Sequence, residues 1–424
     1  MVKTSSTAPL PAAYWRLWWA AAVDNVGDGA FAVAVPLLAV SITHDPRLIS
    51  MISAASYLPW LLFSLPAGAV VDRRDRVALM WTSQAIQAVI VGVIALFAAF
   101  GHVGIAMLAV MAFGLGACEV LFSNAAQAIL PDLVAPALLH KANGKQYTVT
   151  TIGQQFLGPP VGSLLFAIAV ALPFGVDAAS FALSAALLAT LPRRRRTPRN
   201  PTSPNQPSIK VAIAEGLRWL TRHRLLRTLA LLLGVNTFCF QLGSVTLVLL
   251  ATQTLHLGSR GFGLLLAGAA VGSVLGGLVN ATIVARVGAL PALLAALTAN
   301  VILFAGIGVS PNAEVLGALL ALNGFATTMW NIVTVSLRQQ IVPAELLGRV
   351  NSVYRLLGWG LIPLGALTGG LLAHQFGLRA PYPIAGVLRG IALISALPTL
   401  LVTMRTATPT PPPHQSGGPQ SPDE

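Results

Sequence analysis

Long apolar runs separated by short polar segments dominate this chain and constrain its fold more than any other feature. A helix needs roughly 20 apolar residues to cross a bilayer, because lipid offers no hydrogen-bond partner to the backbone. The residues are 55% hydrophobic and only 9% charged, and the mean hydropathy is +0.75. We therefore predict an all-α polytopic membrane protein with twelve transmembrane helices. The expected spans lie at about 14–40, 49–71, 77–99, 103–130, 144–167, 171–191, 226–250, 260–284, 288–309, 313–337, 347–373 and 382–403.

The 26 Lys and Arg residues alternate between segments in a way that sets orientation. With the N-terminus placed inside, all but four fall on the same side of the membrane; the exceptions are Arg47, Arg260, Arg379 and Arg389. This positive-inside pattern predicts that both termini are cytoplasmic. It also accounts for the net charge of +13 without nucleic acid, with anionic headgroups as the partner. Arg389 falls within the last span, where we expect it to extend toward the outer headgroups.

A polar stretch after the sixth span divides the chain into two related halves. We expect six-helix bundles at residues 1–191 and 226–405, a cytoplasmic linker at 192–225 with an amphipathic helix, and a disordered Pro-rich tail at 406–424. Placing Asn124 on Asn331 gives twelve identities over 42 positions. They include the pairs Pro136/Pro343, Tyr147/Tyr354, Gly153/Gly360, Gly158/Gly365 and Gly162/Gly369. Two pseudo-symmetric bundles around a central cavity are one architecture of secondary transporters.

The turn after the second span has a recognisable pattern, Gly-x-x-x-Asp-Arg-x-x-Arg, at residues 68–76. It resembles the signature loop of the major facilitator superfamily, and the Asp-Arg-x-Asp-Arg variant is similar to the macrolide- and enterobactin-exporter branch. Asp75 departs from the commonest form, which often has Gly there. The resemblance implies a latch on the inner gate made by Gly68, Asp72, Arg73 and Arg76.

The fifth span carries a second motif, made of Gly153, Gly158, Pro159 and Gly162. It resembles the antiporter signature G-x-x-x-x-G-P-x-x-G of exporting members of the superfamily. Small residues four apart let two helices approach closely, and proline bends a span. The eighth span has Gly268, Gly272 and Gly276 at the same spacing, so we expect the two spans to pack together across the halves. Ordinary tight helix packing is the alternative interpretation of both stripes.

Three carboxylates stand deep inside predicted spans, namely Asp24, Asp28 and Glu119. A charge at the centre of a bilayer costs about 2.5–3.5 kcal/mol on insertion scales, so each is expected to face a cavity or a partner. Asp24 and Asp28 share one helical face. We hypothesise that Asp28, with Asp24 or Glu119, exchanges a proton for substrate; a structural hydrogen-bonding role is the alternative. Further candidates for the cavity wall are Asn25, Asn236, Gln241 and Asn331.

Together these features predict a secondary active transporter in a bacterial inner membrane. We expect it to export small amphiphilic molecules (drugs, antibiotics or siderophore-like products) by proton antiport with alternating access, and the resemblance implies a monomer. No phosphate-binding loop Gly-x-x-x-x-Gly-Lys-Ser/Thr occurs and the seven His are scattered, so no cofactor or metal is expected. A facilitator or importer of a metabolite remains an alternative, as does a membrane-embedded lipid-modifying enzyme.

Overall fold

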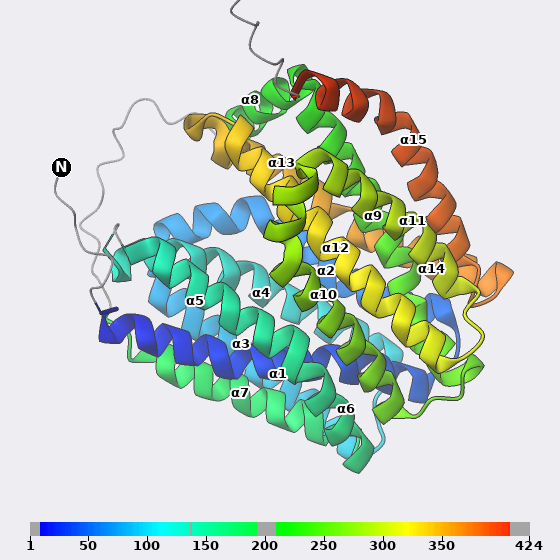
Figure 1. Cartoon of the computed structure of the whole chain (residues 1–424). Coiled ribbons are helices and arrows are strands. Elements are labelled where there is room, and N and C mark those ends of the chain that lie inside the picture. The colour runs from blue at the N-terminus through cyan, green and yellow to red at the C-terminus, as the bar shows by residue number, and fades with distance from the viewer. Residues whose placement is uncertain (1–8, 136–137, 193–208, 408–424) are drawn as a thin grey trace, which may run out of the picture.

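The computed structural model describes residues 9–135, 138–192 and 209–407, and these residues fold into helices without strands. Helices α1–α7 pack on one another, as do α9–α15 (Figure 1). The first group consists of α1 (Ala12–Ile42), α2 (Pro46–Arg73), α3 (Arg76–Ala99), α4 (Ile105–Leu133), α5 (Leu139–Thr151), the π-helix η2 (Ile152–Leu157), α6 (Gly158–Ile168) and α7 (Leu172–Ala189).

The second group of helices follows a 14-residue helix, α8 (Ile209–Arg222). It consists of α9 (Arg224–Leu249), the π-helix η3 (Leu250–Thr254), α10 (Ser259–Val287), α11 (Ala289–Gly308), α12 (Ala313–Ile341), α13 (Ala344–Gly360), α14 (Ile362–Phe376) and α15 (Pro381–Ala407). We call these groups the first and second bundle. In Figure 1 they run at an angle to each other, and α8 lies across one end of the second bundle.

Ten of the helical stretches within the described residues are long and apolar enough to cross a membrane. The other two predicted spans correspond to α2 and to the run α5–η2–α6, which pack among these ten. The fifth predicted span is therefore a broken helix, with the π-helix between two α-helical pieces. The eleventh is also broken, at Leu361, two residues before Pro363 in the first turn of α14. Proline suits a first turn because the backbone N–H that it lacks has no partner there.

The same close contact between helices occurs inside each bundle, which shows that the two bundles are pseudo-symmetric. A Cβ on Gly158 of α6 would lie 2.9 Å from the Ala30 nitrogen of α1 and closer still to Gly29, so these helices touch backbone to backbone. The repeat-related Gly365 of α14 meets α9 in the same way, since a Cβ there would lie 2.6 Å from the carbonyl oxygen of Phe238. The internal sequence repeat thus corresponds to a repeated packing arrangement.

The predicted amphipathic helix is present as α8, next to α13 and α9. Its Leu220 is buried among the apolar side chains of the second bundle, with Trp219 packed alongside. Glu215 of α8 forms an ion pair with Arg349 of α13. The apolar face of α8 therefore covers the end of the second bundle, and the ion pair fastens the helix there.

Candidate functional site

A cavity of about 1220 Å³ lies between the two bundles. From the first bundle, α1, α2, α4, α5 and η2 form most of its wall, and Phe240, Ser273 and Trp359 are among the residues that line it from the second. The lining residues extend from the middle of the helices to the N-terminal parts of α1 and α5, which lie near the α2–α3 turn. We call that end of the molecule, which includes residues 74–75 and α8, the basic end.

At the opposite end the bundles are in contact and close the cavity. The amide of Gln241 on α9 donates to the hydroxyl of Ser53 on α2 at 2.9 Å. Gly370 of α14 packs against Ser50 of α2 so closely that a Cβ there would overlap the Ser50 side chain. His374 Nδ1 also lies 3.6 Å from Asp45 Oδ1, joining the bundles at the rim. In this conformation the cavity is therefore closed at this end, and its lining extends toward the basic end.

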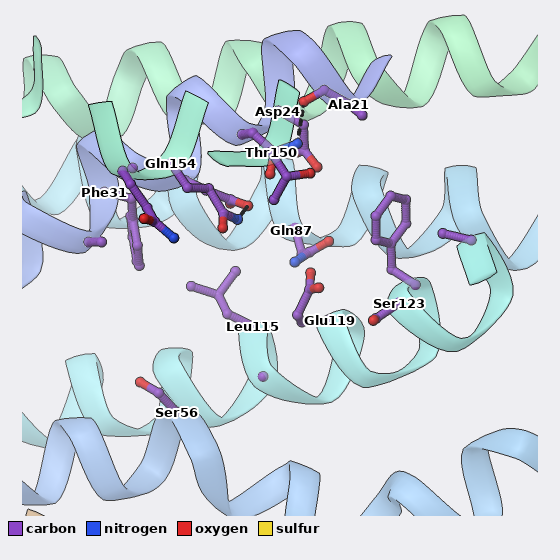
Figure 2. A pocket seen from close by; sticks show the side chains of 18 of the residues that line it. Ala21, Asp24, Phe31, Ser56, Gln87, Leu115, Glu119, Ser123, Thr150 and Gln154 are labelled. Atoms are coloured by element: carbon purple, nitrogen blue, oxygen red, sulfur yellow. Dashed lines mark hydrogen bonds between the residues drawn. The ribbon is translucent and has the colours of Figure 1, made fainter. Parts of the chain in front are cut away.

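The three predicted carboxylates meet inside this cavity, from two different helices. Asp24 and Asp28 come from α1 and Glu119 from α4, and the three lie close enough to interact electrostatically. Figure 2 shows Glu119 extending from α4 toward Gln87, with Asp24 and Gln154 on the far side of the pocket. Asn25 also lines the cavity, and its amide donates to the Ala21 carbonyl of its own helix. The structure thus gathers four of the predicted cavity residues at one place.

Glutamine side chains surround the carboxylates, and sequence analysis missed them. Gln84 of α3 donates to Asp24 Oδ2 at 3.0 Å, and Gln154 of η2 donates to Asp28 Oδ2 at 3.1 Å. Within the described part of the chain, no Lys, Arg or His forms an ion pair with Asp24, Asp28 or Glu119. Amide dipoles rather than counter-charges therefore surround this acid cluster. The sequence signal was present: Gln84 and Gln87 are polar residues one turn apart in an apolar span.

Asp177 is a fourth buried carboxylate near the cluster, and sequence analysis did not select it. It lies in the second turn of α7 with 0% exposure, and the hydroxyl of Ser180 donates to its Oδ1 at 3.3 Å. It packs against Gly27 of α1, where any side chain would overlap it. Unlike Asp28, it does not line the cavity. Asp177 was not chosen as a candidate because it is near the start of a predicted span, and residues at such positions usually lie close to the headgroups.

The broken fifth span supplies a polar path along the cavity. Asn143, Gln146 and Thr150 of α5 and Gln154 of η2 recur every three or four residues, and all four line the cavity. This face leads from the basic end to Asp28. A π-helix inserts one residue into the helical register, and such segments are frequent at functional sites.

The glycine motif of the fifth span packs within its own bundle, contrary to expectation. Gly153, Gly158 and Gly162 all face α1. In the second bundle, Gly272 and Gly276 of α10 face α12 instead of the fifth span. The fifth and eighth spans pack together across the halves as expected, but the glycine stripes do not make this contact, because each serves close packing inside one bundle. The two helices do meet across the bundles, but through other residues: Ser163 fills the space left by Gly263.

The predicted inner-gate residues are only partly described. The surroundings of Gly68 and the side chains of Asp72 and Arg73 lie outside the described part of the chain, so their latch stays a prediction. Arg76 Nη1 donates to the Ala128 carbonyl at 2.6 Å and to Asp132 at 2.7 Å, which ties α3 to α4 within the first bundle. Asp75, the departure from the common loop, caps α3: its carboxylate accepts from the Val77 and Ala78 amides at 2.8 and 3.2 Å.

The candidate residues of the second bundle lie away from the cavity wall. Asn236 donates to the Leu232 carbonyl of its own helix, Gln241 belongs to the closed end, and Asn331 is exposed. Arg389 does not extend to the headgroups as expected. It is 5% exposed, donates to the Asn236 carbonyl at 3.1 Å, and stacks 4.2 Å from the Phe304 ring centroid. A cation–π contact and a backbone acceptor hold the Arg389 guanidinium inside the bundle, away from the headgroups.

Comparison with known proteins identifies the family. The sequence matches the family MFS_3, described as "transmembrane secretion effector", over residues 4–414. The chain belongs to this family of the major facilitator superfamily. It is therefore a multi-pass membrane transporter with small-molecule substrates, and not an enzyme.

Relatives of this major facilitator protein include named efflux proteins. The multidrug efflux pump Tap of Mycolicibacterium fortuitum is 28% identical over 376 residues, covering 86% of this chain and 90% of that protein. Macrolide efflux protein A of Streptococcus pyogenes is 24% identical over 155 residues, covering 37% of this chain and 38% of that protein.

Two solved structures show the same fold at low sequence identity. The nucleoside transporter NupG has a TM-score of 0.72 at 13% identity, covering 92% of this chain and 99% of that chain. A bacterial homologue of the iron transporter ferroportin, solved in an inward-facing state, has a TM-score of 0.66 at 17% identity with the same coverage. The twelve-helix fold of the superfamily predicted from the sequence is thereby confirmed.

Proposed function

We propose that this protein exports small amphiphilic molecules from the cytoplasm of a bacterium across its inner membrane by proton antiport. The acid cluster of Asp24, Asp28 and Glu119 within the cavity carries the proposal. The basic residues around the open end support a cytoplasmic orientation of the cavity mouth and of both chain termini. The efflux proteins Tap and macrolide efflux protein A support drugs and antibiotics as the substrate class.

The surroundings of the carboxylates support exchange of protons. Burying a carboxylate without a cation is costly, and proton binding removes that cost. The Oδ1 atom of Asp24 and the Oε1 atoms of Gln84 and Gln87 are buried without a hydrogen-bond partner among the described atoms. All three are acceptors that lack a donor, and a proton bound to the cluster supplies one. Substrate and proton then compete for one site, which is the requirement for antiport.

The order of steps in the proposed transport cycle follows from which end of the cavity is closed. In the observed conformation the cavity is open at the basic end, so a cytoplasmic amphiphile reaches Asp28 and Glu119 and displaces protons. Rocking of the bundles separates the contacts at the closed end, including Gln241–Ser53. Protons from the outside then displace the substrate, and the protonated cluster returns to the cytoplasmic side.

Vesicle transport tests this proposal. In everted membrane vesicles with an acidic interior, one proton exchanged per substrate supports about ten-fold accumulation for each pH unit of gradient. We expect Asp28→Asn and Glu119→Gln to lower accumulation to the level seen after nigericin collapses the gradient. The matched control is Asp132→Asn, a carboxylate on α4 whose side chain is 42% exposed at the basic end. Accumulation that persists after collapse favours the facilitator alternative, and accumulation unaltered in both cavity variants overturns the coupling role of these residues.

A further inference from the structure

Three aromatic side chains gather where the cavity meets the closed end. Tyr57 and Trp60 come from α2 and Trp359 comes from α13, and all three line the cavity. The Trp60 and Trp359 rings are stacked, with centroids 4.8 Å apart and an angle of 18° between their planes. Tyr57 lies 6.0 Å from Trp359, tilted by 35°. The second bundle therefore presents an indole ring to two aromatic rings of the first.

This aromatic cluster forms part of the end wall of the cavity. Ser53, which contacts Gln241 in the closed end, precedes Trp60 by seven residues on α2, which is about 10 Å along a helix. Trp60 is thus about two turns nearer to the basic end than the polar contact between the bundles. A molecule that enters from the basic end meets the stacked indoles before it meets the closed end.

Trp359 keeps an uncovered surface although it contacts Trp60. It is 40% exposed and is one of the residues that line the cavity. Large apolar faces left open in a cavity are typical of ligand sites, especially with a few polar groups nearby. Glu119 and Asp28 line the same cavity and supply negative charge, and no cation among the described residues forms an ion pair with them. An aromatic platform and an acid cluster in one cavity suit a ligand with a flat ring system and a positive charge.

We propose that Trp60 and Trp359 form a subsite for the flat aromatic ring system of a cationic substrate. This subsite extends the proposed export function and rests on it for the direction of transport. The ring stacks on the uncovered face of Trp359, which Trp60 supports from behind, and the cationic group is oriented toward Glu119 and Asp28. Stacking of this kind tolerates many ring shapes, because every aromatic ring has a π-face.

The subsite is complete in only one conformation, since each bundle supplies one of its two indoles. Rocking that opens the far end moves α13 away from α2 and separates the rings. The aromatic part of the substrate is then bound more weakly in the outward-open form. A difference in affinity of this sign favours loading on the cytoplasmic side and release outside.

Ligand binding to the purified full-length protein provides the test. Ethidium is the probe, followed by fluorescence anisotropy, and dodecyltrimethylammonium is the cation without an aromatic ring. We expect Trp359→Ala to weaken ethidium binding about ten-fold or more, Trp60→Ala to weaken it less, and Trp359→Phe to stay within about three-fold of the wild type. Dodecyltrimethylammonium should bind all three within about three-fold of wild type. The control is Trp19→Ala, an exposed tryptophan of α1 outside the cavity.

A locked variant tests the dependence on conformation. Asp45 and His374 face each other across the rim of the closed end, so Asp45→Cys with His374→Cys, in a background with Cys118→Ser and Cys239→Ser, permits a disulfide that holds this end shut. We expect the oxidised protein to bind ethidium as tightly as the reduced protein and to lose transport. Weaker binding after oxidation contradicts a subsite completed in this conformation.

The outcomes separate this proposal from the proposed function. Equal ethidium binding by wild type and Trp359→Ala, or no binding by wild type, overturns the subsite and leaves proton-coupled export standing. Selective loss of ethidium binding in Trp359→Ala, together with unaltered accumulation in Asp28→Asn, supports the subsite and overturns the coupling role.

Discussion

Replacing Gly158 by Ala tests how tightly α6 must pack on α1 for the acid cluster to form. The new Cβ would lie 2.9 Å from the Ala30 nitrogen and nearer still to the backbone of Gly29. All of these atoms belong to the backbone of α1, so no side-chain rotation relieves the overlap and the two helices must separate. Overpacking of this kind costs about 1–3 kcal/mol, or roughly a five- to 150-fold change in the folding equilibrium.

The displacement should also reach the site, because Asp28 is adjacent to Gly29 and its hydrogen bond to Gln154 joins α1 to η2, the segment that leads directly into α6. Chemical denaturation in detergent, followed by tryptophan fluorescence, measures the free energy of unfolding. The matched control is Gly92→Ala in α3, where the nearest atom to the new Cβ is 3.9 Å away. That variant should be neutral or gain about 0.5–1 kcal/mol from helix propensity. Gly158→Ala as stable as Gly92→Ala refutes the packing argument.

Three further predictions concern groups outside the cavity. Asp75→Ala removes the cap of α3 and should lower the free energy of unfolding by about 0.5–2 kcal/mol, measured by chemical denaturation; no loss contradicts the capping role. Tyr354→Phe should cost about 0.5–1.5 kcal/mol in the same assay, since it removes the 2.7 Å hydrogen bond to the Leu226 carbonyl; equal stability would show that water replaces this bond. The hydrogen bond from Arg47 lowers the pKa of Asp45, so the pair stabilises the fold above the ordinary Asp pKa and loses that effect as pH falls. Asp45→Asn should therefore be less stable than wild type at pH 7, and thermal melts should show the difference shrinking toward pH 3; a constant difference contradicts the sign.

The helices were predictable from the sequence because lipid imposes one requirement on every span. Apolar length located the spans to within a few residues, as in α3 (Arg76–Ala99) against the expected 77–99. The breaks at η2 and at Leu361 were not predicted, although prolines lie close to both. Proline removes one hydrogen bond from a helix, but whether the chain bends, restarts or forms a π-turn depends on the helices packed against it.

Sequence analysis located the cavity-lining carboxylates, whose role stays a prediction, and was less successful in locating neutral polar groups. Asp24, Asp28 and Glu119 converge because an isolated carboxylate in lipid is so unfavourable that a cavity or partner is required. A neutral amide can be buried in a span without a cavity, because it can donate to a backbone carbonyl of its own helix, as Asn236 does. The position of Arg389 could not be predicted from the sequence either, because a backbone carbonyl and an aromatic ring from distant segments hold it inside the bundle.

Proton release on substrate binding tests the central claim, that the acid cluster exchanges protons for substrate. Purified protein in weakly buffered detergent solution is mixed with ethidium, and a pH indicator records the protons released per substrate bound. We expect release by the wild type and by Asp132→Asn, and a clear reduction in Asp28→Asn and Glu119→Gln. Release by Asp28→Asn and Glu119→Gln equal to that of the wild type, at equal substrate occupancy, would contradict it.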